Sequence, residues 1–287
     1  QAGGSTAGGE GIKMAYKIAK EHFIEGGNNR VILATDGDFN VGASSDRAME
    51  DLIEEKRNSG VFLTCLGFGM GNYKDSKMET LADKGNGNYA YIDNMQEAKR
   101  VLGTEFGGTI YTIAKDVKIQ VEFNPGKVAA YRLIGYENRL LNDEDFNDDQ
   151  KDAGELGSGH TVTALYEIIP VGVKSKFLKE VDDLKYSTMK NKDYGEELLT
   201  VKFRYKEPDG NNSKLITKTV NSPETGKEPS EDLKFMSAVA LFGMNLRESE
   251  YSNNCGNEVV IDLAEAGRGA DGDGYRAEFI RLVKTYE

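Results

Sequence analysis

The hydrophobic period of the sequence changes near residue 113, and this change constrains the fold more than any other feature. Before it, residues at helical spacing such as Ile12 and Tyr16 alternate with short apolar runs such as RVILAT at 30–35. This alternation predicts a parallel sheet covered by helices. After it, apolar and polar residues alternate in runs such as KDVKIQVEF at 115–123, which predicts half-buried antiparallel strands.

We therefore expect two domains, because a single hydrophobic core rarely grows past roughly 250 residues and the chain has 287. The predicted fold class is α/β. A partial doubly wound, Rossmann-like parallel sheet is expected over residues 1–112. A second, β-rich α+β domain with terminal helices is expected over residues 113–287.

Local signals place individual elements within this outline. Asp75, Asn94 and Ser230 stand where helices are expected to begin, because their side chains can accept hydrogen bonds from unpaired backbone N–H groups. The region 142–158, rich in Asp and Asn, is expected to be a solvated loop. The first antiparallel strand is expected to gather its apolar residues on one face; these are Val117, Ile119, Val121 and Phe123.

The charge of the chain argues against nucleic acid as a partner. Lys and Arg number 36 against 48 Asp and Glu, a net charge of −12, which repels phosphate backbones. The two cysteines are too few for a disulfide framework or a zinc cluster, and Cys65 is expected to pack inside a strand. The longest apolar stretch, residues 235–244, is about half the roughly 20 residues that cross a bilayer.

Oxygen-bearing side chains gather where a ligand is expected. In open α/β sheets, ligands bind outside the carboxyl ends of the strands, and Asp36, Gly37 and Asp38 follow the strand at 30–35. Thr6 belongs to a loop of small residues, QAGGSTAGGEG, that also leads into a helix. Carboxylate and hydroxyl oxygens suit a hard divalent cation such as Mg²⁺, Ca²⁺ or Mn²⁺.

The pairing of GGST before a helix with ATDG after the next strand resembles the von Willebrand factor A domain. In that family a metal-ion-dependent adhesion site uses an Asp-x-Ser-x-Ser loop, a threonine from a second loop and the aspartate of a Thr-Asp-Gly turn. The resemblance implies that Thr6 and Asp36 are metal ligands. Ser5 and Asp38 are expected at the rim of the same site.

The resemblance continues beyond the first domain. The segments DFNDDQKDAGELGSGHTVTALYEI, AVALFGMNLRES and GYRAEFIRLVK are similar to a carboxyl-terminal domain of unknown function that follows the A domain in a bacterial group. The chain is thus expected to be a bacterial A-domain protein that lacks the amino-terminal half of that domain.

The resemblance implies a metal-ion-dependent protein-binding or adhesion module, not an enzyme, whose protein ligand offers a carboxylate to the ion. No small-molecule cofactor is expected. The implied location is extracytoplasmic, in the envelope or periplasm or at the surface of a bacterium. The alternatives are a structural envelope or assembly protein without metal dependence, or a hydrolase with a catalytic constellation at the strand ends.

One departure from the family pattern limits the metal site. The sequence contains no Asp-x-Ser-x-Ser segment, so we expect a divalent cation in the complete protein but weak or absent binding in this chain. Without the preceding strands, the strand at 30–35 becomes an exposed sheet edge. We expect either a homodimer through this strand or cover from GGSTAGGEG.

Rival sites are weaker. GGSTAGGEG lacks the Gly-Lys-Ser/Thr ending of a phosphate-binding loop and has no strand before it. The acidic loop is not an EF-hand, because Asp148 stands where that motif needs glycine and Gly154 where it needs glutamate. A different calcium site through Asp152 or Glu155 and a purely solvated loop both stay open, as they do for GADGDG at 269–274.

Overall fold

The computed structural model describes residues 8–37, 46–70, 73–151, 153–178, 194–208, 210–222 and 227–286. Within these ranges, no helix combines the length and the apolar composition that a bilayer crossing requires.

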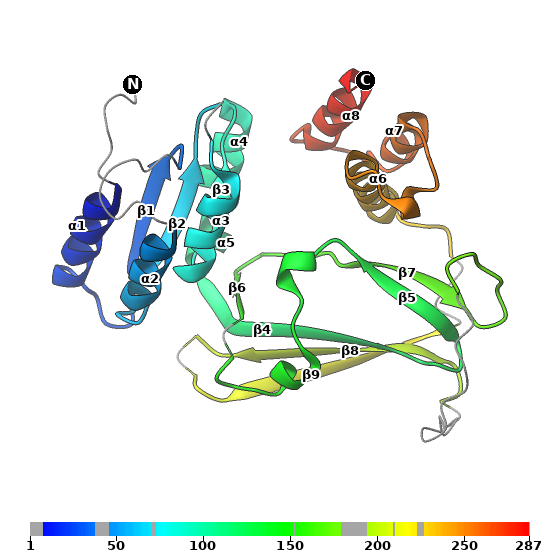
Figure 1. Cartoon of the computed structure of the whole chain (residues 1–287), viewed down its shortest axis with the longest axis horizontal. Helices are drawn as coiled ribbons and strands as arrows, with labels where there is room; N and C mark the ends of the chain where they lie inside the picture. The colour runs from blue at the N-terminus through cyan, green and yellow to red at the C-terminus, as the bar shows by residue number, and fades with distance from the viewer. Residues whose placement is uncertain are drawn as a thin grey trace. The chain divides into compact units, whose positions relative to one another are not determined.

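The amino-terminal strands form a parallel sheet in the order β1-β2-β3 (Figure 1), with β1 at Arg30–Thr35, β2 at Phe62–Gly67 and β3 at Tyr89–Tyr91. The register of β1 and β2 runs without interruption from Arg30↔Phe62 to Thr35↔Gly67. All three strands therefore end at the same edge of the sheet, and β1 has a described neighbour on one side alone.

Helices pack on both faces of this sheet. On one face, α1 (Gly8–Glu21), α2 (Asp46–Arg57) and α3 (Asp75–Lys84) surround a core that includes Ile12, Ile53, Leu63, Cys65 and Met78. Burying one such aliphatic side chain contributes about 1.5–3 kcal/mol to stability.

The opposite face is covered by a broken helix. It consists of α4 (Met95–Lys99), the π-helical turn η1 (Arg100–Thr104) and α5 (Phe106–Ile110). Val101 of η1 packs there against Leu66 and Ile92. The expected parallel α/β fold is confirmed, and Cys65 is fully buried as predicted.

Two of the three predicted helix starts are confirmed. The side chain of Asn94 accepts a hydrogen bond from the Glu97 N–H, at 2.9 Å. Ser230 accepts one from the Leu233 N–H, at 3.1 Å.

The third predicted start is displaced by one residue. Asp75 is the first residue of α3, and Lys74 occupies the capping position without a side-chain hydrogen bond. The Asp75 carboxylate is engaged elsewhere, because it accepts a hydrogen bond from the hydroxyl of Tyr89.

The remaining strands form two further sheets. A four-stranded sheet has the order β6-β4-β8-β9, and β5 pairs antiparallel with β7. Their bounds are β4 Thr112–Phe123, β5 Val128–Ile134, β6 Gly154–Gly157, β7 Leu165–Pro170, β8 Glu197–Lys206 and β9 Ser213–Asn221. Short 3-10 helices lie at Glu137–Arg139, Asp143–Phe146 and Glu250–Ser252.

The predicted buried face of β4 is confirmed only in part: Phe123 is buried and Val117 and Val121 are half-buried, but Ile119 is not. Ile119 is 48% exposed, whereas Lys118, on the opposite face, is only 4% exposed. The strand is irregular before this point, because the β4–β6 register shifts on both sides of Ala114 and Asp116 adopts a left-handed conformation with φ of 51°. The backbone carbonyls of Asp145 and Asp148 bind the ammonium of Lys118 from that opposite side.

The chain ends in α6 (Glu231–Leu246), α7 (Asn257–Ala266) and α8 (Tyr275–Thr285). Phe235, Val260 and Ile280, one from each helix, meet in a common core. Phe279 packs edge-on against Phe235 and Phe242, with ring centroids 5.4 and 5.8 Å apart. The predicted β-rich region with terminal helices is confirmed.

The chain divides into two compact units, each discontinuous in sequence. The first contains Gln1–Gln120, Asp143–Thr161 and Phe203–Ile216. The second contains the rest of the chain. The domain boundary between residues 112 and 113 stays a prediction.

Candidate functional site

Asp36 lies at the carboxyl edge of the parallel sheet, directly after β1, with an exposed side chain. Its backbone carbonyl accepts a hydrogen bond from the Lys74 N–H, at 3.2 Å. The next residue, Gly37, has φ of 80°, and its N–H donates to the hydroxyl of Thr35, at 3.2 Å. Because φ is positive, glycine is favoured at this turn.

The loop after β2 approaches Asp36 from the neighbouring strand. Gly69 has φ of 98°, and a Cβ added to it would lie 3.8 Å from the Cβ of Asp36. The Tyr91 hydroxyl donates to the Gly69 carbonyl, at 2.6 Å. Tyr91, at the end of β3, therefore fixes the loop that lies beside Asp36.

The ring of Tyr73 lies against the end of β2. A Cβ added at Gly67 would lie 1.8 Å from the hydroxyl oxygen of Tyr73, so glycine is required for this ring to lie where it does. The ring of Tyr73 also packs against Tyr91, with centroids 4.6 Å apart.

A hydrogen-bonded chain continues from Tyr73 to the start of α3. The hydroxyls of Tyr73 and Tyr89 lie 2.5 Å apart, and Tyr89 donates to the Asp75 carboxylate, so Tyr73 donates to Tyr89. Burial, reinforced by the hydrogen bond to Asp75, raises the pKa of Tyr89. Burial also raises the pKa of Tyr73. Both phenols are neutral at physiological pH and act as hydrogen-bond donors.

Of the predicted site residues, Asp36 alone falls within the described ranges. Ser5, Thr6 and Asp38 lie outside them, so the predicted metal site stays a prediction. Among described residues, no group of three or more His, Cys, Asp or Glu side chains is arranged to hold a metal ion. The Asp36 carboxylate is exposed on a narrow turn and fits one ligand position of a hard cation.

Sequence reasoning missed the tyrosine cluster, defined here as Tyr73, Tyr89 and Tyr91 with Asp75. A signal was present: Tyr89 and Tyr91 are two residues apart in a strand and therefore share a face. Tyr73, from the loop before α3, has no such periodic signal.

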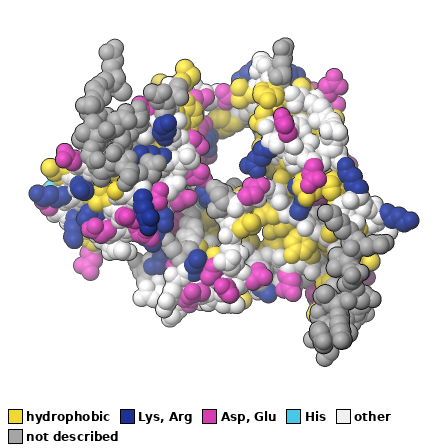
Figure 2. Space-filling model, viewed as in Figure 1, with side chains coloured by type: hydrophobic (Ala, Val, Ile, Leu, Met, Phe, Trp, Pro, Cys, Tyr) yellow, Lys and Arg dark blue, Asp and Glu magenta, His cyan; other side chains and the backbone are white. Residues whose placement is uncertain are grey.

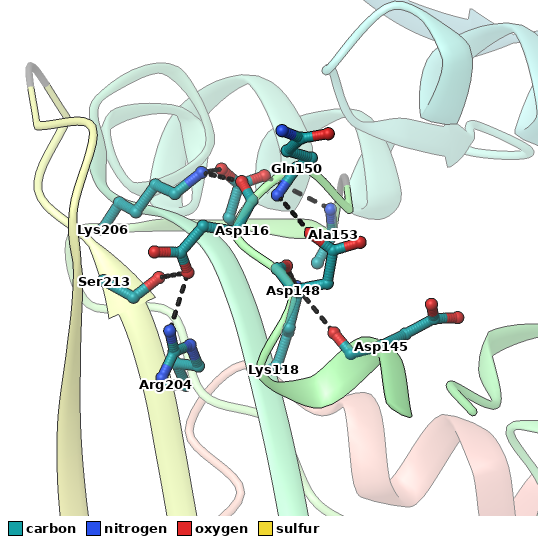
Figure 3. A network of polar contacts seen from close by, with 10 residues as sticks. Asp116, Lys118, Asp145, Asp148, Gln150, Ala153, Arg204, Lys206 and Ser213 are labelled. Carbon is teal, nitrogen blue, oxygen red and sulfur yellow. Dashed lines mark hydrogen bonds and ion pairs between the residues drawn. The ribbon is translucent and has the colours of Figure 1, made fainter. Parts of the chain in front are cut away.

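The acidic segment 143–151 is held by cations of the chain itself (Figure 3). Lys118 donates to the backbone carbonyl of Asp145, at 3.0 Å, and to that of Asp148. A side-chain ammonium thus binds two carbonyl oxygens that could otherwise face a metal ion. Phe146, in the same segment, is buried.

A second buried lysine holds the other end of this segment. The ammonium of Lys206 lies 2.6 Å from the Asp116 carboxylate and donates to the Asp149 carbonyl, at 2.7 Å. The Asp149 carboxylate accepts from Arg204, at 2.8 Å, and from Ser213. The hydrogen bonds from Ser213 and Arg204 lower the pKa of Asp149 to about 2.

The expectation that 142–158 is a purely solvated loop is therefore wrong. The region contains β6, a buried aromatic ring and a network of lysine-bound oxygens. For the calcium alternative, Asp152 lies outside the described residues, and Glu155 is half-buried within the electrostatic reach of Arg30.

GADGDG also has an internal role. The side chain of Asp271 is only 4% exposed, and it accepts hydrogen bonds from the N–H groups of Arg276, at 3.0 Å, and Ala277, at 2.8 Å. Although burial acts to raise the pKa of Asp271, these backbone hydrogen bonds lower it overall. Asp271 thus caps the first turn of α8.

Comparisons with known proteins identify relatives of the chain. A family model described as "Uncharacterized protein YfbK, C-terminal" matches residues 108–287. "Uncharacterized protein YfbK" of Escherichia coli (strain K12) is 45% identical over 284 residues, which are 98% of this chain and 48% of that protein. The chain therefore spans about half the length of this curated relative.

Among solved structures, von Willebrand factor type A from Catenulispora acidiphila aligns with 99% of this chain and 64% of that chain. The TM-score is 0.41 and the sequence identity 13%.

Proposed function

The chain belongs to the family of protein YfbK, and on that premise we propose that it is a protein-binding module whose contact is made through a divalent cation at the carboxyl edge of the parallel sheet. The proposal is for binding, not catalysis. The observation that carries it is the place of Asp36, exposed after β1 on a turn flanked by Gly37 and Gly69.

The ligands proposed for the ion are Asp36 and Thr6, with Ser5 and Asp38 at the rim. When bound, a cation held largely by neutral oxygens stays electrophilic and can accept a carboxylate from a protein partner. Asp36 is the single charged ligand of the pair Asp36 and Thr6, because the Thr6 hydroxyl is neutral. We therefore expect this chain alone to bind the ion weakly or not at all. Stronger binding is proposed for the complete gene product.

The tyrosine cluster supports a rigid binding edge. Tyr91 holds the Gly69 carbonyl beside Asp36, while Tyr73 and Tyr89 tie the end of β2 to the start of α3. Because the phenols of Tyr73 and Tyr89 stay protonated, they are suited to positioning the loop and not to accepting a proton.

The test is capture of a partner with and without metal. The complete gene product is immobilised, and proteins retained from an extract of its own organism are compared in Mg²⁺ with Mn²⁺ and in EDTA. We expect a specific partner that is lost in EDTA and lost with Asp36→Ala. Asp93→Ala is the matched control, since Asp93 is an exposed aspartate that follows β3.

Two outcomes would contradict the proposal. Metal-independent retention that survives Asp36→Ala would favour a structural or assembly protein. Turnover of a small substrate that Asp36→Ala abolishes would favour a hydrolase.

The edge strand β1 is proposed to be covered by a second copy of the chain, because residues 8–11 of the alternative cover, the segment 3–11, are the first turn of α1. Ile32 on this strand is 46% exposed, and unpaired edges of apolar strands attract other strands. Analytical ultracentrifugation with hydrogen exchange on residues 30–35 tests this idea. A monomer whose amides in this strand exchange rapidly would contradict it.

An extracytoplasmic location in a bacterium is proposed with this function, because the relative comes from Escherichia coli and hard-cation sites of modest affinity need abundant cation. Cell fractionation with an antibody to the chain tests the location. Recovery in the cytoplasmic fraction alone would contradict it.

A further inference from the structure

A groove of about 770 Å³ lies between α1 and α2, on the helical side of the parallel sheet. Four lysines line it: Lys13, Lys17 and Lys20 from α1, and Lys56 from α2. The two acidic residues of its lining, Asp51 and Glu55, both lie on α2. The groove is thus locally basic in a chain whose net charge is −12.

The three lysines of α1 form one stripe. They are spaced by four and three residues, so their side chains project on the same side of the helix. All three are exposed. In Figure 2, dark blue basic side chains lie among magenta acidic ones at the left of the view, where Figure 1 shows α1 and α2.

Within the described part of the chain, only some of the lysines that line the groove form ion pairs. Lys17 lies 3.9 Å from Glu21, and Lys56 pairs with Glu55, at 2.7 Å. Among the described residues, neither Lys13 nor Lys20 has a carboxylate oxygen within 4.0 Å. Lys13 nevertheless lies within electrostatic reach of Glu55, whose pKa is lowered chiefly by Lys56 and in part by Lys13, so Lys20 is the more open of the two to an external acid.

The floor of the groove is apolar. Tyr16 is 2% exposed and Leu52 is 9% exposed, and both line the groove while packing in the core beneath it. Because both side chains are nearly withdrawn from the surface, a ligand that lies along α1 would contact chiefly the ammonium groups at the rim.

We propose that this groove binds an acidic segment of a protein partner, with Asp or Glu carboxylates paired to Lys13, Lys17 and Lys20. Charge complementarity selects this occupant: a basic or neutral segment gains nothing from the lysine stripe, and the acidic remainder of the chain repels an acidic segment elsewhere. The proposal is independent of the cation site at Asp36.

Fluorescence anisotropy with a short labelled peptide of repeated Glu-Glu-Leu tests the proposal. We expect saturable binding at low salt that weakens as ionic strength rises to about 0.15 M. The triple variant Lys13→Gln, Lys17→Gln, Lys20→Gln should bind about tenfold more weakly, because each exposed ion pair contributes only modestly. EDTA and Asp36→Ala should leave peptide binding unchanged, which separates this site from the cation site.

The control is a second triple variant with the same change in net charge, Lys99→Gln, Lys218→Gln, Lys227→Gln, whose lysines are also exposed. It should retain most of the affinity. Circular dichroism shows whether both variants are folded. An equal loss in both triple variants, an absence of binding, or stronger binding of a DNA oligonucleotide than of the peptide would overturn the proposal.

Discussion

The ammonium of Lys206 lies 2.6 Å from the carboxylate of Asp116, and both side chains are largely withdrawn from water, at 10% and 16% exposure. The same ammonium donates to the Asp149 carbonyl. Lysine side chains thus bind the backbone carbonyls of Asp145, Asp148 and Asp149 within the acidic region. The region is held by charges that the chain carries itself.

Removing one partner of this pair should destabilise the protein. Lys206→Met leaves the Asp116 carboxylate without its cation in a poorly solvated place, and we expect a loss of about 3 kcal/mol in the free energy of unfolding. Urea unfolding measures it. Lys214→Met, at an exposed pair with Glu207, should leave the free energy nearly unchanged. Equal effects of the two substitutions would contradict this account.

The carboxylate of Asp149 should titrate abnormally low. Its pKa is lowered to about 2 by hydrogen bonds from Ser213 and Arg204, whereas an unfolded chain has about 3.9. Because the folded pKa is the lower one, the stabilisation is present above the unfolded pKa and is lost as pH falls toward about 2. NMR titration should show that Ser213→Ala raises this pKa. An unchanged value would mean that the Ser213 hydroxyl does not hold the carboxylate.

Gly67→Ala should displace Tyr73. The new Cβ would lie 1.8 Å from the Tyr73 hydroxyl oxygen, so the ring must move and lose its hydrogen bond to Tyr89. We expect a loss of about 1–3 kcal/mol, measured by chemical denaturation. Gly103→Ala, with no heavy atom within 4 Å of its new Cβ, should be harmless.

A double-mutant cycle identifies the cause of this loss. If Tyr73 is what Gly67→Ala disturbs, the substitution should cost little in a Tyr73→Ala background. If the effects of Gly67→Ala and Tyr73→Ala on stability are additive instead, the loss caused by Gly67→Ala arises in the backbone of β2.

Asp271→Ala should weaken the start of α8. The carboxylate caps the N–H groups of Arg276 and Ala277, and losing such a cap costs about 1–2 kcal/mol. Its pKa lies below the usual value, so this contribution is present at neutral pH and is lost as pH falls through that lowered pKa. Hydrogen exchange of both amides should accelerate. Asp262→Ala, at an exposed position in α7, should leave the hydrogen exchange of these two amides unchanged.

The sequence predicted best where the signal was local. The bounds of β1 match the apolar run RVILAT, and Asn94 and Ser230 cap their helices as expected. Helix α7 was not anticipated, because its capping position is Gly256, which has no side chain to mark it.

The prediction failed where distant residues decide the outcome. Lys118 is buried by two carbonyl groups 27 and 30 residues away in sequence, and the periodicity of β4 cannot anticipate such partners. The tyrosine cluster also joins residues from different elements. Asp36 could be placed, in contrast, because the carboxyl ends of parallel strands share one edge.

Isothermal calorimetry of the complete gene product with Mg²⁺ and with Mn²⁺ tests the proposed function most directly. We predict saturable binding at one site in the wild type and in Asp93→Ala, and its loss in Asp36→Ala. A flat titration of the wild type, or an unchanged isotherm for Asp36→Ala, would contradict the proposed cation site.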